Sequence, residues 1–325
     1  MYYSSTQLIC KPVHIAISDV ESNTLVQKSS GQKLGPMGGG RFYPALPTTG
    51  ISINNLWVYT TVAVPFGFFV NKAVTATKCS AGLVGNYCTA NSQCNTTPTA
   101  TDGVCSTTPT TIDTISRSEV NQIFGGQAYD WSDFGAYFTA QPVVACLRHA
   151  GSGAHAAFDA TVMNGAGWGV PVAQVENTDN SMGPITWFNR GRTDLIKCVN
   201  GATTTTTTGS LIGAIGYAVA DEPIGVPGVS QNVKAIRYNG VWPSRATIRN
   251  GSYDYYTMSN HIVPSYSEVG YTIAFLAEKF RTYLTNPNYI PLSKANYWAS
   301  KYEMKFYRTD MQYPVYSGAT VPMLP

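Results

Sequence analysis

The residues best suited to chemistry lie in one run, 147–154, which reads Leu-Arg-His-Ala-Gly-Ser-Gly-Ala. A strand-like apolar stretch precedes this run, and an alanine-rich, helix-like stretch follows it. The first turn of a helix attracts anions, because its backbone N–H groups lack helical partners and face the positive end of the helix dipole. Arg148 would add a planar charged fork and Ser152 a hydroxyl donor. The run therefore predicts an oxyanion site, although plain strand-to-helix connections also carry Gly-Ser-Gly.

Catalysis would need a different arrangement of residues. The chain has four scattered histidines: His14, His149, His155 and His261. They match no metal-binding spacing such as His-Glu-x-x-His. Ser152 is close to two of them, but Gly-Ser-Gly lacks the Gly-x-Ser-x-Gly pattern of a nucleophile elbow. We therefore expect a protein that is not an enzyme and that needs no metal and no cofactor.

Four of the seven cysteines fall in one threonine- and asparagine-rich segment, 79–105: Cys79, Cys88, Cys94 and Cys105. Their spacing does not fit the paired Cys-x-x-Cys of a zinc site, and no histidine follows at ligand spacing. Two disulfides that staple this polar insertion are the better interpretation. Disulfides of this kind indicate an oxidising compartment, so we expect a periplasmic or extracellular protein.

The other three cysteines are Cys10, Cys146 and Cys198. An odd number means that at least one is a free thiol or is bonded outside the chain. Cys146 lies in an apolar run, where a buried and inert thiol is the simpler alternative to a disulfide. The pairing within this set stays open at this point.

Composition narrows the class of protein further. A chain of 325 residues with 44% hydrophobic residues can bury a large core and usually forms two domains or lobes. The net charge of +3 is small and the basic residues are dispersed, so we expect no nucleic-acid partner. The first residues do not resemble a signal peptide, which predicts a removed signal or a late start. No apolar run of about 18 residues predicts a membrane-spanning helix.

Apolar β-rich runs alternate with amphipathic helical runs, which is typical of an α/β fold. Strands are expected at 13–19, 56–71, 142–148 and 211–219, the first of them short and buried. Helices are expected at 116–126, with Ser116 as N-cap, in the stretch 149–163, where a glycine-rich turn opens a helix, and at 267–284. A threonine run, 203–208, reads as a loop.

Several ordered stretches resemble the landmarks of the periplasmic phosphate-binding proteins of ABC transporters. They are SRSEVNQIFGGQAYDWSDFG, VVACLRHAGSGAHAAFDATVM, GAIGYAVADEP and VKAIRYNGVWPSRATIRNGSYDYY, preceded by HIAISDVE and VAVPFGFFVNKAV. The resemblance implies the two-lobed type II periplasmic-binding-protein fold, with a disulfide-rich insertion at 79–105. Trp131 lies in one of these stretches and is expected to anchor the packing and not to contact a ligand.

The same resemblance implies a division into lobes. Lobe I would comprise residues 1–70 and 223–325, and lobe II residues 71–222 with the insertion. The chain would cross between the lobes near Val70 and near Glu222.

The resemblance also implies roles at the anion site. Asp19 would accept a hydrogen bond from a protonated phosphate oxygen, although a helix cap after the strand is an alternative role. Arg148 would grip the phosphate, with Ser152 as a hydroxyl donor and Gly153 as a backbone donor. Ala154 stands where the family usually has threonine, so one hydrogen bond worth about 0.5–1.5 kcal/mol is missing.

Two functions follow from this resemblance. The first is a receptor that binds phosphate or a similar oxyanion and delivers it to an ABC transporter permease. The second arises because the family's N-terminal strand and loops have no counterpart before His14, where only residues 5–9 could be the tail of its helix. Lobe I would then be completed by another chain, and the protein would be a structural or assembly subunit of an extracellular array.

Overall fold

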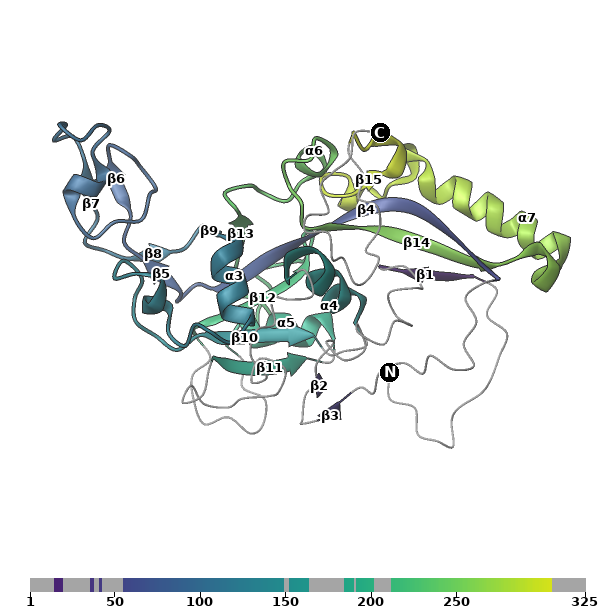
Figure 1. Cartoon of the computed structure of the whole chain (residues 1–325), viewed down its shortest axis with the longest axis horizontal. Coiled ribbons are helices and arrows are strands. Elements are labelled where there is room, and N and C mark those ends of the chain that lie inside the picture. Colours follow the sequence, from purple (N-terminus) through teal and green to yellow (C-terminus); the bar gives the residue numbers. More distant parts are fainter. Residues whose placement is uncertain are drawn as a thin grey trace.

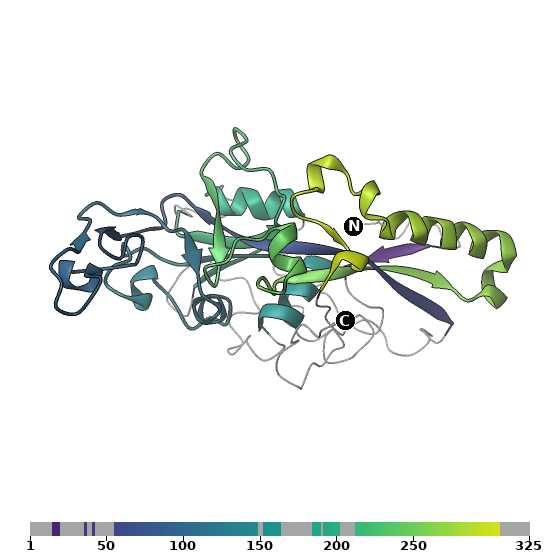
Figure 2. The same cartoon turned by 90° about the horizontal axis from the view of Figure 1, so that it is seen from above.

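The protein is elongated, with a narrow arm at one end and a long helix over a β-ribbon at the other (Figures 1 and 2). A computed structural model describes residues 15–19, 36–37, 41–42, 55–148, 152–163, 184–189, 191–201 and 212–305. Predictions made for Cys10, His14, His149 and the threonine run 203–208 lie outside these residues.

Strand β4 (Leu56–Asn71) is the spine of a nine-stranded sheet in the described part of the chain. Its first half pairs antiparallel with β14 (Tyr256–Pro264), which in turn pairs with β1 (Ala16–Ser18). Its second half pairs antiparallel with β12 (Ala214–Val219) and β13 (Val233–Tyr238). One continuous strand therefore carries both halves of the sheet.

The parallel part of the sheet lies beyond β12. Strand β10 (Val144–Arg148) pairs in parallel with β12 on one side and with β11 (Ile185–Asn189) on the other. The short strands β9 (Thr114–Ile115) and β15 (Ala299–Ser300) attach to β13 and β4. Three two-stranded ribbons complete the strands: β2 (Pro36–Met37) with β3 (Arg41–Phe42), β5 (Thr75–Ala76) with β8 (Thr110–Thr111), and β6 (Cys79–Ala81) with β7 (Val104–Cys105).

Successive side chains of a strand point to opposite faces of the sheet. Apolar side chains lie on both faces of this sheet, and helices cover both. On one face, Phe68 packs in an aromatic cluster with residues of α3 (Arg117–Phe124) and α4 (Gly153–Phe158). On the other face, Phe69 joins a second core with α5 (Arg192–Val199). These layers confirm the predicted α/β fold.

Local signals in the sequence set several boundaries. Helix α3 begins where predicted, because Ser116 Oγ accepts from the Glu119 backbone N–H at 3.2 Å and Glu119 accepts from the Ser116 N–H at 2.7 Å. Helix α4 continues as a π-helical turn, Asp159–Met163. Among the described residues, the remaining α-helices are α6 (Arg245–Arg249) and α7 (Tyr266–Thr285), and α7 has a break at Gly270. No helix among the described residues is long and apolar enough to cross a membrane.

One expectation was wrong, and one alternative that the sequence left open is settled. Strand β1 is not buried: Ile17 is 55% exposed, because β1 pairs with β14 on one side and has no second pairing strand among the described residues. Cys146 is not an inert thiol, since it forms a disulfide with Cys198 that ties β10 to α5. Trp131 is buried as expected, and its indole N–H donates to the Gly213 carbonyl at 2.9 Å.

The insertion 79–105 is the arm, and its two predicted disulfides are present. Cys79 pairs with Cys94, and Cys88 pairs with Cys105, so the two bridges interlock. The four sulfurs form a small cluster of their own, separate from the two cores of the sheet. The disulfides therefore replace the hydrophobic core that this polar segment lacks.

We expect the double replacement of Cys146 and Cys198 by alanine to lower the free energy of unfolding by about 4 kcal/mol. The bond closes a 52-residue loop, whose closure entropy in the unfolded chain has about that value. Urea unfolding of the purified variant measures the loss. The double replacement of Cys88 and Cys105 is the control, because it should loosen the arm and leave the main transition nearly unchanged. Equal losses in the two variants would contradict this assignment.

Candidate anion-binding site

The candidate site lies where the parallel strands end. Strand β10 ends at Arg148 and β11 at Asn189, which is its partner in the ladder. Helices α4 and α5 begin shortly after these two strands. In open α/β sheets, ligands bind in the crevice beyond the carboxyl ends of such strands, near the N-termini of the helices.

Arg148 holds its position through its backbone and carries its charge into a partly buried environment. Its backbone N–H donates to the Tyr217 hydroxyl of β12 at 3.2 Å. Burial lowers the pKa of the guanidinium, while Tyr217, Asp194 and Asp19 act against this change. A guanidinium still keeps its proton at neutral pH, so the site carries a fixed positive charge.

Asp19, which directly follows β1, meets the start of α4. A side-chain carbon added to Gly153 would lie 2.6 Å from Asp19 Oδ2, so a larger residue at position 153 would displace the Asp19 side chain. Burial raises the pKa of the Asp19 carboxyl, and the Arg148 charge opposes this change. Asp19, Arg148 and Gly153 therefore come together from two distant parts of the chain.

Ser152 and Ala154 flank Gly153 and have different surroundings. Ser152 is buried, and its hydroxyl oxygen lies 3.4 Å from the His155 backbone N–H, which donates to it. This contact leaves the hydroxyl proton of Ser152 available for another acceptor. Ala154 is partly buried against the main core. The ligand roles predicted for all five residues, Asp19 included, stay predictions.

The Tyr217 hydroxyl is a contact of the site that the sequence analysis missed. It lies 2.5 Å from His155 Nδ1 and also accepts from the Arg148 backbone. Both ring-bearing side chains are almost fully buried. Tyr217 therefore links β12, β10 and α4 directly beside the candidate site. The sequence carried one usable signal, a tyrosine near the end of an expected strand in an otherwise small and apolar stretch.

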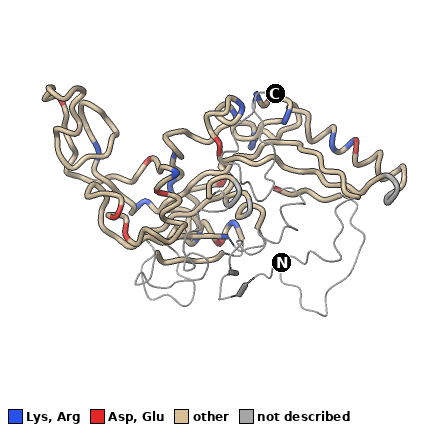
Figure 3. The backbone as a smooth tube through the Cα atoms, viewed as in Figure 1, with Lys and Arg blue, Asp and Glu red and all other residues tan. Residues whose placement is uncertain are grey.

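Three further charged residues near the site were also missed. Arg192, at the start of α5, pairs with the mostly buried Glu222 at 2.7 Å. Asp194 accepts from the Gly191 backbone N–H at 3.0 Å and so closes the first turn of α5. Charged positions are sparse along the described backbone, so each of these groups weighs on the local field (Figure 3).

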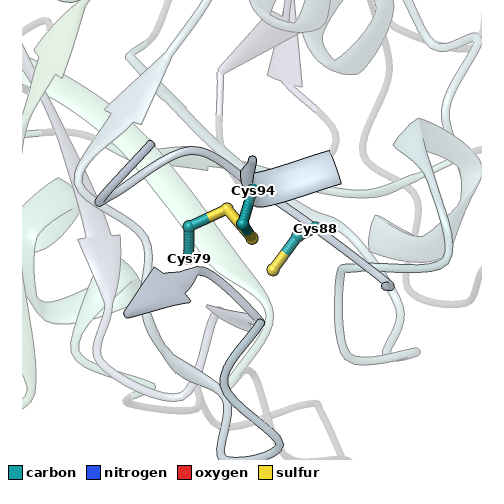
Figure 4. Close-up of side chains that lie close together, drawn as sticks. All are labelled: Cys79, Cys88 and Cys94. Carbon is teal, nitrogen blue, oxygen red and sulfur yellow. A yellow bond between two sulfur atoms is a disulfide. The ribbon is translucent and has the colours of Figure 1, made fainter. Parts of the chain in front are cut away.

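Among the described residues, three cysteine sulfurs lie close enough together to be considered as metal ligands. Those of Cys79, Cys88 and Cys94 lie within 4.8 Å of one another in the arm (Figure 4). All three are oxidised in disulfides, so they offer no thiolate to a metal. The two interlocked disulfides of the arm explain why these sulfurs lie close together.

The large mixed sheet with helices on both faces defines an α/β protein. Residues 81–288 match the family model of the PBP superfamily domain, and the chain belongs to this superfamily. The predicted membership in the binding-protein class, with a disulfide-rich insertion, is thereby confirmed. The predicted boundaries of the two lobes stay a prediction. No curated protein sequence matches the chain.

Solved structures give similar but distant matches. An ABC-type phosphate transport receptor from Vibrio cholerae is 15% identical, with a TM-score of 0.41 over 76% of this chain and 72% of that one. A putative phosphate ABC transporter substrate-binding protein from Clostridium perfringens is 14% identical, with a TM-score of 0.44 over 72% and 67%. A phosphate-binding protein from Stenotrophomonas maltophilia is 12% identical, with a TM-score of 0.46 over 86% and 71%. Scores this low do not identify the ligand of this chain.

We expect Asp19→Asn to increase the free energy of unfolding at pH 7. The raised pKa means that ionised Asp19 costs stability in the folded state, and the isosteric amide removes that cost. Below the ordinary value of 3.8 the carboxyl is protonated in both states, so the gain should vanish there and grow as the pH rises through the folded pKa. Urea titrations of both proteins at pH 3.5 and 7 test this. A gain of equal size at both pH values would contradict the burial of an ionisable group.

Proposed function

We propose that this protein binds phosphate without catalysis, as a periplasmic or extracellular solute receptor. The observation that supports this proposal is the meeting of Asp19 with Arg148 and Gly153 beyond the carboxyl ends of the parallel strands. An arginine and a carboxylate at one anion site suit a ligand that is both an oxyanion and a hydrogen-bond donor. Phosphate at neutral pH is such a ligand, and the sequence landmarks resemble those of phosphate-binding proteins.

Arg148 would supply most of the affinity. Its guanidinium can donate two parallel hydrogen bonds to two phosphate oxygens, and each charge-assisted bond is worth about 1.5–3 kcal/mol. Its partial burial strengthens these bonds, because less water competes for the ligand. The backbone N–H groups at the start of α4, Gly153 among them, would complete the coordination.

Asp19 would supply the selectivity. An ionised carboxylate can only accept hydrogen bonds, so it needs a ligand oxygen that carries a proton. Phosphate carries one at pH 7 to 8, whereas sulfate does not. Sulfate would therefore place an unprotonated oxygen against Asp19 and meet electrostatic repulsion. This selectivity makes ionised Asp19 useful despite its cost to stability.

A receptor role would also require the two halves of the sheet to move relative to each other. Asp19 comes from the half of the sheet built on β14, and Arg148 comes from the half built on β10. A ligand held by both would favour a closed arrangement of the two halves, and its release would need a hinge movement. We infer that the partner which receives the phosphate is the permease of an ABC transporter.

Arg148→Ala should weaken phosphate binding at least about 100-fold, because two charge-assisted hydrogen bonds are lost. Isothermal titration of phosphate-stripped protein at pH 7.5, with phosphate and then sulfate, measures this. Arg237→Ala is the control, since it also removes an arginine, and Arg237 is exposed on β13 and makes none of the contacts described at the candidate site. No heat from folded wild-type protein with either anion would refute the receptor function.

Asp19→Asn should change the selectivity between the two anions. The amide N–H₂ can donate to an unprotonated oxygen, so sulfate should bind the variant more tightly than it binds the wild type. The same titrations give the ratio of the two dissociation constants. Glu222→Gln is the control, because it also neutralises a partly buried carboxyl but pairs with Arg192 outside the proposed ligand contacts. An unchanged ratio of the two dissociation constants in Asp19→Asn would show that Asp19 does not select phosphate by the proton on its oxygen.

A further inference from the structure

Helix α7 leaves three of its four described aromatic side chains largely exposed. Ala274 and Ala277 are buried on the side that contacts the ribbon of β4 and β14, where the fourth aromatic side chain, Phe280, packs its ring on His261. Tyr271 is 79% exposed, Phe275 46% and Tyr283 52%. Surface helices normally turn their large apolar side chains inward, so this outward face is a candidate interaction surface.

A second exposed apolar surface lies on the arm. Leu83 and Val84 lie in the turn that follows β6, and Val104 of β7 pairs with Ala81 beside them. Val84 is 70% exposed, and the other two are each at least 40% exposed. The two interlocked disulfides hold this tip in one shape, which lowers the entropy cost of using it in an interface.

The arm and α7 lie at opposite ends of the long axis of the molecule (Figures 1 and 2). A contact between them cannot form within one chain, but it can form between two copies. We propose that the arm tip of one copy docks on the outward face of α7 of the next copy. Such a contact is heterologous, because each copy offers a different surface, and it therefore leaves both ends open for further copies.

The charges of the two surfaces support a second copy as the occupant. Asp102 is the charged residue between Cys79 and Cys105, and it lies two residues before Val104. Lys279 is the basic residue of the outward face of α7, with its ammonium 5.2 Å from the centre of the Phe275 ring. The neighbouring Glu278 forms an ion pair with Arg281, so the stretch 278–281 carries one net positive charge. In the proposed contact, Asp102 of one copy would lie opposite Lys279 of the next, and each lies among apolar side chains.

The size of the surfaces predicts a weak association. The arm tip offers three aliphatic side chains, and the helix face offers a row of three aromatic side chains with Leu276 beside them. Interfaces of this kind fall below the roughly 1,200 Å² buried in stable complexes. The association should therefore appear at high micromolar protein concentration, or where copies are held close together.

Sedimentation of the wild-type protein over a range of concentrations tests the association. We expect the mean mass to rise with concentration beyond two chains. Val84→Asp should abolish the rise through the arm, and Phe275→Ser with Tyr283→Ser should abolish it through the helix. Leu292→Ser is the control, because Leu292 is 94% exposed outside both surfaces. Circular dichroism and urea unfolding check that each variant is folded, so this test does not depend on the outcome for the anion site.

A mixture of the two defective variants gives the sharper result. One variant keeps the helix face and the other keeps the arm, so an equimolar mixture should form two-chain complexes and stop there. A wild-type protein that stays monomeric at every concentration would overturn the proposal. So would a mixture that stays monomeric, or a Leu292→Ser variant as defective as the other two. Monomeric protein that binds lipid vesicles through α7 would instead assign this face to a membrane.

Discussion

The continuity of strand β4 is the constraint on which the rest of the structure depends. Its 16 residues pair with β14 through their first half and with β12 and β13 through their second half. Both faces of its second half are buried, with Phe68 in one core and Phe69 in the other. A strand buried on both faces reads as a nearly continuous apolar run, and the sequence of β4 has that form.

This spine brings together residues that no local signal connects. Asp19 is positioned by β1 and β14, whereas Arg148 is positioned by β12 and β10. The disulfide between Cys146 and Cys198 fixes β10 against α5 two residues before Arg148. The proposed ligand would therefore sit between groups whose distance is set by the ladder pairings of the whole sheet.

The two ends of the molecule show how a fold can be extended without enlarging its core. The arm is polar and depends on disulfides, while the ribbon of β4 and β14 is covered on one face by the single helix α7. Both devices give length at little cost in buried apolar surface. The arm and α7 also leave apolar side chains exposed to water, and docking of a second copy would bury them.

The sequence by itself determined the elements with strong local signals. The Ser116 capping box placed α3, the apolar run 56–71 placed β4, and the close spacing of four cysteines indicated a stapled insertion. Each of these signals depends on residues within a few positions of one another. The ordered landmarks likewise indicated the superfamily, because they keep their order along the chain.

Only the tertiary structure decided which distant residues meet. The bond between Cys146 and Cys198, the contact of Tyr217 with His155 and the exposure of β1 all follow from sheet order. Sheet order is set by the summed burial of many side chains and is not encoded in any one segment. The outward face of α7 was hidden for the same reason: its sequence is amphipathic in appearance, and only the packing reveals which side the sheet covers.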